Sequence, residues 1–249
     1  MFLPACLPVA IFVLTAVTTS ITFYLSAIYT DHVNYTLPYI SDTGTYPPES
    51  CIFGQLLNII SVLVGFVMYI KFRQVKEIFE KHHIDEQLNI NEIGLFVGIL
   101  AAFGISVVAN FQETNVFVVH WIGAILTFGC GSVYCSLQTL LYIKISPVIG
   151  QRKLTLFRII LSLVSFVTFL VFTITGFMAY AEFKGDDVTK WTKEDGGFDI
   201  HQISTNTEWI CAGCTMIYIL LLVQEFRKIT VRPLTVVLEP PTLCDAHPT

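Results

Sequence analysis

The sequence predicts an all-α membrane protein, a bundle of six transmembrane helices with both chain termini in the cytoplasm. Hydrophobic residues make up 54% of the 249 residues, and charged residues make up only 13%, whereas an average soluble domain is about 25% charged. Stretches without charged side chains also recur along the chain, each near the ~20 residues that a helix needs to cross a bilayer. Because so few charges cannot cover a water-soluble fold of this size, lipid must surround most of the surface.

The charge-free stretches place the six helices, since an ionised side chain at the bilayer centre is costly. The expected spans are residues 8–28, 51–70, 93–111, 116–143, 159–181 and 203–226. The apolar gap of the sixth span, between Glu208 and Glu225, is short. We therefore expect that helix to begin earlier in the chain and to carry Glu208 about one turn inside. One membrane domain, residues 1–235, should precede a short cytoplasmic tail, residues 236–249.

The first hydrophobic stretch could instead be a signal peptide. It has no positively charged segment before it, its apolar run is too long, and no clear cleavage site of small residues follows. We expect it to be retained as a helix.

Lys and Arg in the connecting loops predict the orientation, because cytoplasmic loops carry an excess of these residues. The loops after spans two and four and the tail contain most of them, including Arg73, Lys76, Lys153 and Arg227. The segments 31–50, 112–115 and 182–207 should then face the lumen or the outside. The sequon Asn34-Tyr35-Thr36 lies on that side, so Asn34 could be glycosylated.

Small residues in spans three and four should mark the packing faces of the bundle, because lipid supplies little hydrophobic drive for helix association. In span three they follow four-residue steps: Gly94, Gly98, Ala102, Ser106 and Asn110. In span four they lie along one face: His120, Ala124, Thr127, Gly131 and Gln138.

Polar side chains gather near the predicted lumenal ends of the helices, where their desolvation cost makes them informative. The candidates are Glu49, Asn58, Asn110, Gln112, Glu113, His120 and Glu208. Once folded, they could share one lumenal pocket, in which His120 would be the pH-sensitive member. Alternatively, they only meet water and headgroups at helix ends, or form structural hydrogen bonds between helices.

The sequence favours a protein that is not an enzyme. It contains no G-x-S-x-G, no P-loop and no H-E-x-x-H motif, and we expect no cofactor, metal or catalytic residue. Its Lys and Arg form no basic stripe, so nucleic acid is not an expected partner. Most of the seven cysteines fall in or beside apolar stretches. Cys211 and Cys214 should be ordinary helix residues, although a bridge between Cys51 and Cys211 is an alternative.

One loop carries a recognisable string, from Pro38-Tyr39-Ile40-Ser41-Asp42-Thr43-Gly44-Thr45 through Pro47-Pro48-Glu49-Ser50-Cys51-Ile52-Phe53-Gly54. A second string is Val108-Ala109-Asn110-Phe111-Gln112-Glu113, followed by His120, and a third is Glu208-Trp209. These strings resemble the Frag/DRAM/Sfk family, most closely its damage-regulated autophagy modulators. The signature positions in the loop are Ser41, Asp42, Gly44 and Pro48.

The resemblance implies six membrane helices and a regulatory role rather than a known set of catalytic residues. It implies residence in lysosomal or late endosomal membranes and promotion of autophagy, in some cases linked to stress-induced cell death. The partners would be a membrane lipid, and a membrane or cytosolic protein. Other branches of the family imply a plasma-membrane scaffold or regulator of phosphoinositide kinases. A channel, a transporter or a lipid-handling protein is a further alternative. Because the polar residues lie mainly in the outer half, we expect a one-sided pocket rather than a through-pore.

Overall fold

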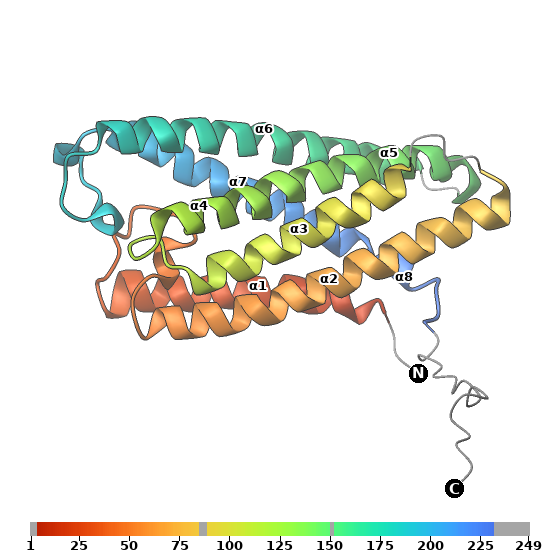
Figure 1. Cartoon of the computed structure of the whole chain (residues 1–249), viewed down its shortest axis with the longest axis horizontal. Helices are drawn as coiled ribbons and strands as arrows, with labels where there is room; N and C mark the ends of the chain where they lie inside the picture. Colours follow the sequence, from red (N-terminus) through yellow and green to blue (C-terminus); the bar gives the residue numbers. More distant parts are fainter. Residues whose placement is uncertain (1–3, 85–88, 150–151, 232–249) are drawn as a thin grey trace, which may run out of the picture.

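The computed structural model describes residues 4–84, 89–149 and 152–231. In those residues, six helices are long and apolar enough to cross a membrane, and they lie side by side in one elongated bundle (Figure 1). They cover Cys6–Tyr29, Glu49–His82, Ile90–Asn110, Phe117–Pro147, Leu154–Glu182 and Phe198–Phe226. The predicted all-α fold with six membrane helices is therefore confirmed.

The bounds of the elements follow the chain in a simple order. They are α1 (Cys6–Phe23), α2 (Glu49–His82), α3 (Ile90–Asn110), α4 (Phe117–Ala124), α5 (Gly131–Ile149), α6 (Arg152–Glu182), α7 (Phe198–Leu221) and α8 (Val223–Phe226). Two π-helical segments continue helices within the bundle: Tyr24–Tyr29 extends α1, and Ile125–Cys130 joins α4 to α5. Short 3₁₀ turns at Asp42–Gly44, Val188–Lys190 and Lys193–Asp195 lie in the connecting loops.

Several helices are longer than the stretches expected from the sequence, among them α6, which begins at Arg152 rather than at residue 159. Helix α2 continues past residue 70 to His82, and α7 already begins at Phe198. The reason is that a gap between charges marks the part of a helix that lipid can surround, whereas a helix can continue into water. The exposed ion pair of Arg73 with Glu77 on α2 is such a continuation. The expected tail, residues 236–249, lies outside the described residues.

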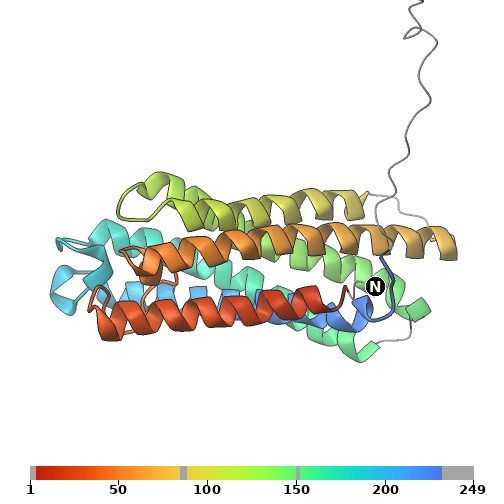
Figure 2. The ribbon, with the colours of Figure 1, turned by 90° about the horizontal axis from the view of Figure 1, so that it is seen from below.

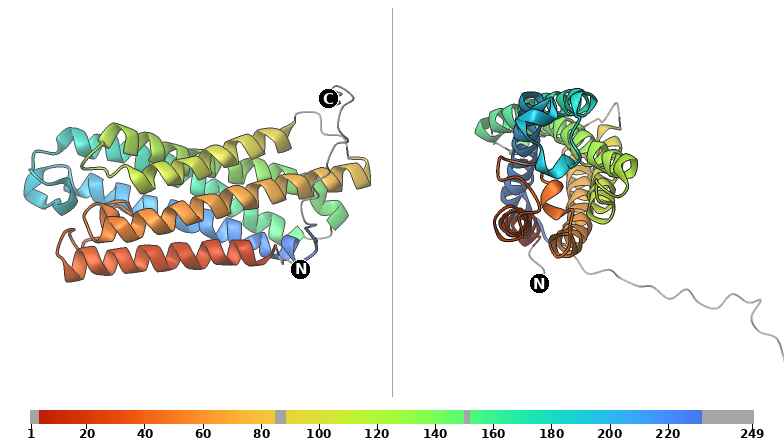
Figure 3. Two further views of the ribbon diagram at one scale, coloured as in Figure 1. Left: turned by 60° about the horizontal axis from the view of Figure 1, so that its bottom comes forward. Right: turned by 90° about the vertical axis from the view of Figure 1, so that its left-hand side faces the viewer.

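The six spans form a closed ring in which each packs beside its neighbours in sequence, and α1 closes the ring against α7. The view along the bundle in Figure 3 shows this ring, and Figure 2 shows α1 and α2 side by side. We call the end that holds Cys6 and Phe226 the terminal end. The loop end holds the connections 30–48, 111–116 and 183–197. Which end faces the cytoplasm remains a prediction.

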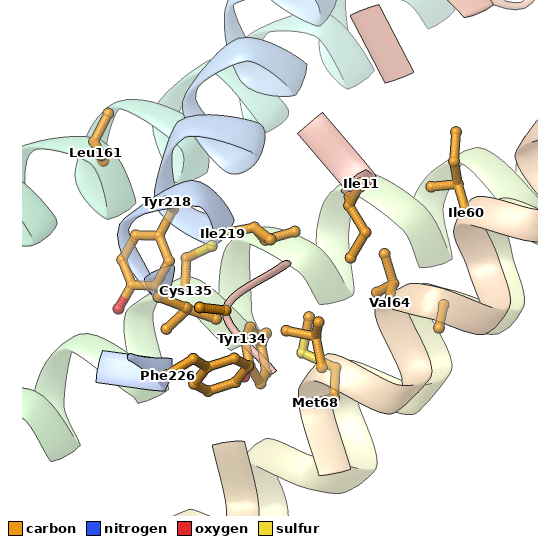
Figure 4. Close-up of a cluster of buried hydrophobic side chains, with 14 residues drawn as sticks. Ile11, Ile60, Val64, Met68, Tyr134, Cys135, Leu161, Tyr218, Ile219 and Phe226 are labelled. Atoms are coloured by element: carbon orange, nitrogen blue, oxygen red, sulfur yellow. The ribbon is translucent and has the colours of Figure 1, made fainter. Parts of the chain in front are cut away.

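The core of the bundle lies toward the terminal end, where α1, α2, α5, α7 and α8 meet (Figure 4). Gly98 of α3 permits the close approach there, because an added Cβ would lie 2.9 Å from the Tyr134 ring and 3.0 Å from Met68 Cγ. The expected small-residue face of α3 is buried at Gly94, Gly98 and Ala102. At its far end Asn110 is exposed, although its side chain still hydrogen-bonds to Asn58 of α2.

Candidate functional site

The connection between α1 and α2 folds back into the ring of helices and fills the space between them at the loop end. Tyr39, Asp42, Thr43 and Thr45 are all buried, although they belong to a connection between helices. The Thr43 hydroxyl lies 2.8 Å from that of Thr22 on α1, within hydrogen-bonding distance. We call the loop residues 38–48 the cap; its buried part, which includes residues 42–45, belongs to the packed interior.

Gly44 lets the cap sit this deep. A Cβ at this position would lie 2.3 Å from Cγ of Phe53 on α2. No side chain fits in that space, so the ring of Phe53 packs directly on the backbone of the cap.

Three carboxyl groups from different parts of the chain hold the cap, and we call Asp42, Glu113 and Glu208 the carboxylate cluster. Asp42 accepts the backbone N–H of Tyr39 at 3.1 Å, and Glu208 on α7 accepts that of Ile40 at 2.9 Å. All three are at most 5% exposed.

Glu113 joins the cap to the neighbouring helices. It accepts hydrogen bonds from the Ser41 hydroxyl, at 3.4 Å, and from the Tyr180 hydroxyl of α6. Since Glu113 follows α3, this one carboxylate connects α3, α6 and the cap.

The cluster is electrostatically unusual because its carboxyl groups are buried together. Burial first, and then the nearby carboxylates of Glu113 and Glu208, raise the pKa of Asp42 well above its ordinary value. Burial likewise raises the pKa of Tyr39. Among the described residues, no Lys or Arg forms an ion pair with any of the three carboxyl groups. Without a cation nearby, two ionised carboxylates in the cluster would repel each other. A proton shared within the cluster removes this repulsion.

His120 lies beside the cluster and is buried. Its Nδ1 is 2.6 Å from the carbonyl oxygen of Phe111. Because a carbonyl only accepts, Nδ1 carries the proton and donates it, which leaves Nε2 as the acceptor in the neutral ring. His120, Glu208 and Ser41 all line a cavity of about 280 Å³ that extends from the cap into the bundle.

The predicted polar residues fall into separate groups rather than one. Glu49 starts α2 and accepts a hydrogen bond from the Thr30 hydroxyl, and its Oε1 lies 3.1 Å from Nδ1 of His32. Asn58 and Asn110 hydrogen-bond to each other on the α2–α3 face, at 3.1 and 3.2 Å. These two groups are distinct from the one in which Glu113, Glu208 and His120 meet the cap.

The remaining predicted positions lie in the loops. Gln112 is half-buried in the turn between α3 and α4, and Pro48 is exposed directly before α2. Asn34 is half-buried, and its side-chain amide donates to the carbonyl of Trp191 at 3.2 Å. Its glycosylation remains a prediction.

A second charged cluster, the terminal-end ion cluster, was not anticipated. Glu225 of α8 forms ion pairs with Lys71 of α2 and with Arg158 of α6, and all three side chains are buried. The guanidinium also lies over the rings of Tyr142 and Tyr218, at 4.3 and 5.1 Å. One carboxylate therefore joins two cations and links three helices.

Cys51 and Cys211 do not form a disulfide bond. Cys51 is exposed, Cys211 is buried, and both are free, so the alternative of a disulfide between them is wrong. The Cys211 thiol donates instead to the carbonyl of Ser165 at 3.4 Å. Within the described residues, no group of three or more His, Cys, Asp or Glu side chains is arranged to hold a metal ion.

Sequence reasoning missed Tyr39, Asp42 and Tyr180 as members of the site at the cap. Asp42 was noticed only as a signature position of the loop. One signal in the sequence could have indicated that Asp42 is buried. Asp42 lies among the small residues Ser41, Thr43 and Gly44, and a loop of small residues can turn inward.

Comparison with known proteins extends over almost the whole chain. The model of the Frag1/DRAM/Sfk1/Cwh43P N-terminal domain matches residues 4–229. DNA damage-regulated autophagy modulator protein 2 of Mus musculus is 37% identical over 93% of this chain and 85% of its own length. DNA damage-regulated autophagy modulator protein 1 of Homo sapiens is 34% identical over 84% of this chain and 85% of its own. No solved structure matches significantly.

Proposed function

We propose that this chain, which belongs to the Frag1/DRAM/Sfk1/Cwh43P family, is a membrane regulator that promotes autophagy from the late endosome or lysosome. The observation that supports the proposal most is the similarity to proteins named autophagy modulators along nearly the full length of the chain. In this proposal the chain acts by binding, without a reaction of its own. A link to stress-induced cell death is part of the same proposal.

The chemistry of the carboxylate cluster supports an acidic compartment. The excess of Lys and Arg in the other loops would place the cap in the lumen. There, the loop end would face an acidic solution in a lysosome and a neutral one at the cell surface. A cluster that holds a proton more tightly when folded is stabilised by acid.

The thermal stability of the purified chain should therefore rise as the pH falls from neutral. The folded-state pKa of Asp42 is raised above the ordinary value of 3.8, so the folded state binds this proton more tightly than the unfolded state. That contribution is fully present below the ordinary value and is lost as the pH rises through the raised one. Melting in detergent across this range measures it, and Asp42→Asn should flatten the curve.

Asp31→Asn is the matched control, because Asp31 is an exposed acid in the same loop, with a positive φ that Asn also tolerates. This variant should keep the pH dependence of the wild type. A wild-type curve that rises toward neutral pH would contradict the role assigned to Asp42.

Two observations in cells test the proposal directly. A tagged chain should reside in lysosomal or late endosomal membranes, and its overexpression should raise autophagic flux measured with a lysosomal inhibitor present. Residence at the plasma membrane with unchanged flux would overturn the proposal and favour a scaffold for phosphoinositide kinases.

A further inference from the structure

The proposed function leaves the cavity beneath the cap without a role. Its volume is about 280 Å³, and its walls come from α1, α2, α3 and α7 and from the segment between α4 and α5. It extends from Ser41, His120 and Glu208 at the cap to Met68, Tyr134 and Ile219 deeper in the bundle. Figure 4 shows the last three among the core side chains.

The size and lining of the cavity suit one hydrocarbon chain. An apolar cavity of about 150 Å³ is enough to bind benzene, and small-molecule sites begin near about 300 Å³. The cavity therefore has room for part of a single chain but not for two. Below the cap its walls are formed by side chains such as Leu57, Ile60 and Val64. Close-packed interiors rarely leave a void of this size, because its lining atoms lose their dispersion contacts.

We infer that the cavity opens toward lipid between α1 and α7. Ala16 on α1 and Gly213 on α7 both line the cavity, and both are exposed. Each is close to the middle of its span, Cys6–Tyr29 or Phe198–Phe226, so the opening lies near the mid-plane of the bilayer. A Cβ added at Gly213 would meet no atom within 4 Å. These small residues leave a gap through which a lipid tail can enter sideways.

The polar side chains at the cap end of the cavity determine which ligand head group can bind there. Glu208 lines it, and Glu113 lines the small adjoining pocket together with Ser41 and His120. The carboxylate cluster has no Lys or Arg partner among the described residues. This surrounding favours a head that donates hydrogen bonds and carries positive charge, and it disfavours a carboxylate or phosphate head.

We propose that the cavity binds one molecule of a single-chain amino alcohol lipid, a long-chain base. Its tail enters between α1 and α7, and its ammonium and hydroxyl groups lie against Glu208 beneath the cap. The π-helical segment Ile125–Cys130 contributes Thr127 and Phe128 to the wall, at the kind of helix irregularity that often accompanies binding sites. The site does not depend on the role in autophagy.

Photo-crosslinking tests the proposal with the purified full chain in phosphatidylcholine nanodiscs. The probes are sphingosine and palmitate, each carrying the same diazirine and alkyne on the chain. Sphingosine should label peptides of α1 and α7 and should be displaced by unlabelled sphingosine. If palmitate labels the chain as strongly as sphingosine does, the assignment of the head group is wrong. The assignment is also wrong if sphingosine labels Glu208→Gln and the wild type equally.

Two variants of α7 test the entrance. Gly213→Trp should close the gap and lower sphingosine labelling about tenfold, which corresponds to about 1.4 kcal/mol of binding free energy. Ile210→Trp is the matched control, because Ile210 is 48% exposed on the same helix and does not line the cavity. Gly213→Leu replaces Gly213→Trp if the larger side chain prevents folding, as judged by size-exclusion chromatography. Equal labelling of the Gly213 and Ile210 variants would overturn the proposed route.

Discussion

Replacing Glu225 with glutamine should destabilise the bundle by about 3–5 kcal/mol, the usual cost of leaving a buried ion without its partner. Lys71 and Arg158 both form their ion pairs with this one carboxylate, and both are buried. The variant would leave two neighbouring cations without a counter-charge. We expect a strongly lowered melting temperature in detergent and a lower yield of folded protein.

Glu77→Gln is the control, because Glu77 pairs with Arg73 on an exposed face of α2 and should leave the melting temperature unchanged. Replacing all three members of the ion cluster with apolar residues of similar size should recover much of the loss. If Glu225→Gln and Glu77→Gln have the same melting temperature, the ion cluster does not stabilise the terminal end of the bundle.

Gly44→Ala should destabilise the loop end by about 1–3 kcal/mol, the range for forcing an extra carbon into a packed interior. The new Cβ would lie 2.3 Å from Cγ of Phe53, so either the ring or the cap must move. If the cap moves, Ile40 and Ser41 shift away from Glu208 and Glu113, and the pH dependence of melting should weaken as well.

Gly213→Ala is the matched control for this substitution. An added Cβ meets no atom within 4 Å at Gly213, and alanine is the better helix former by about 1 kcal/mol. Its melting temperature should stay equal or rise. A Gly44→Ala variant that melts like Gly213→Ala would show that the cap does not pack against α2 as described.

The spans were predictable because the cost of a charge in lipid acts on each residue locally. The same reasoning failed at the terminal end. Lys71 and Arg158 directly flank the expected spans 51–70 and 159–181, and Glu225 ends the apolar gap of the sixth span. The three side chains nevertheless meet in space, across 154 and 67 residues of sequence. Opposite charges at the same end of three spans were the signal that could have paired them.

At the loop end, the sequence indicated which side the polar residues share but not which of them meet. Which side chains meet depends on how each helix is rotated about its own axis. The position of a helix end in the sequence does not determine that rotation. Thus Glu49 turns toward His32, whereas Glu208 turns toward the cap. The inward fold of the cap depends on Gly44 against Phe53, a contact between a loop and a helix that no local pattern encodes.

The most direct test of the central claim is autophagic flux in cells that lack this chain, measured with a lysosomal inhibitor present and again after the wild-type chain is returned. We expect flux to fall without the chain and to recover when it is restored to lysosomal or late endosomal membranes. Unchanged flux in cells that lack the chain would contradict the account.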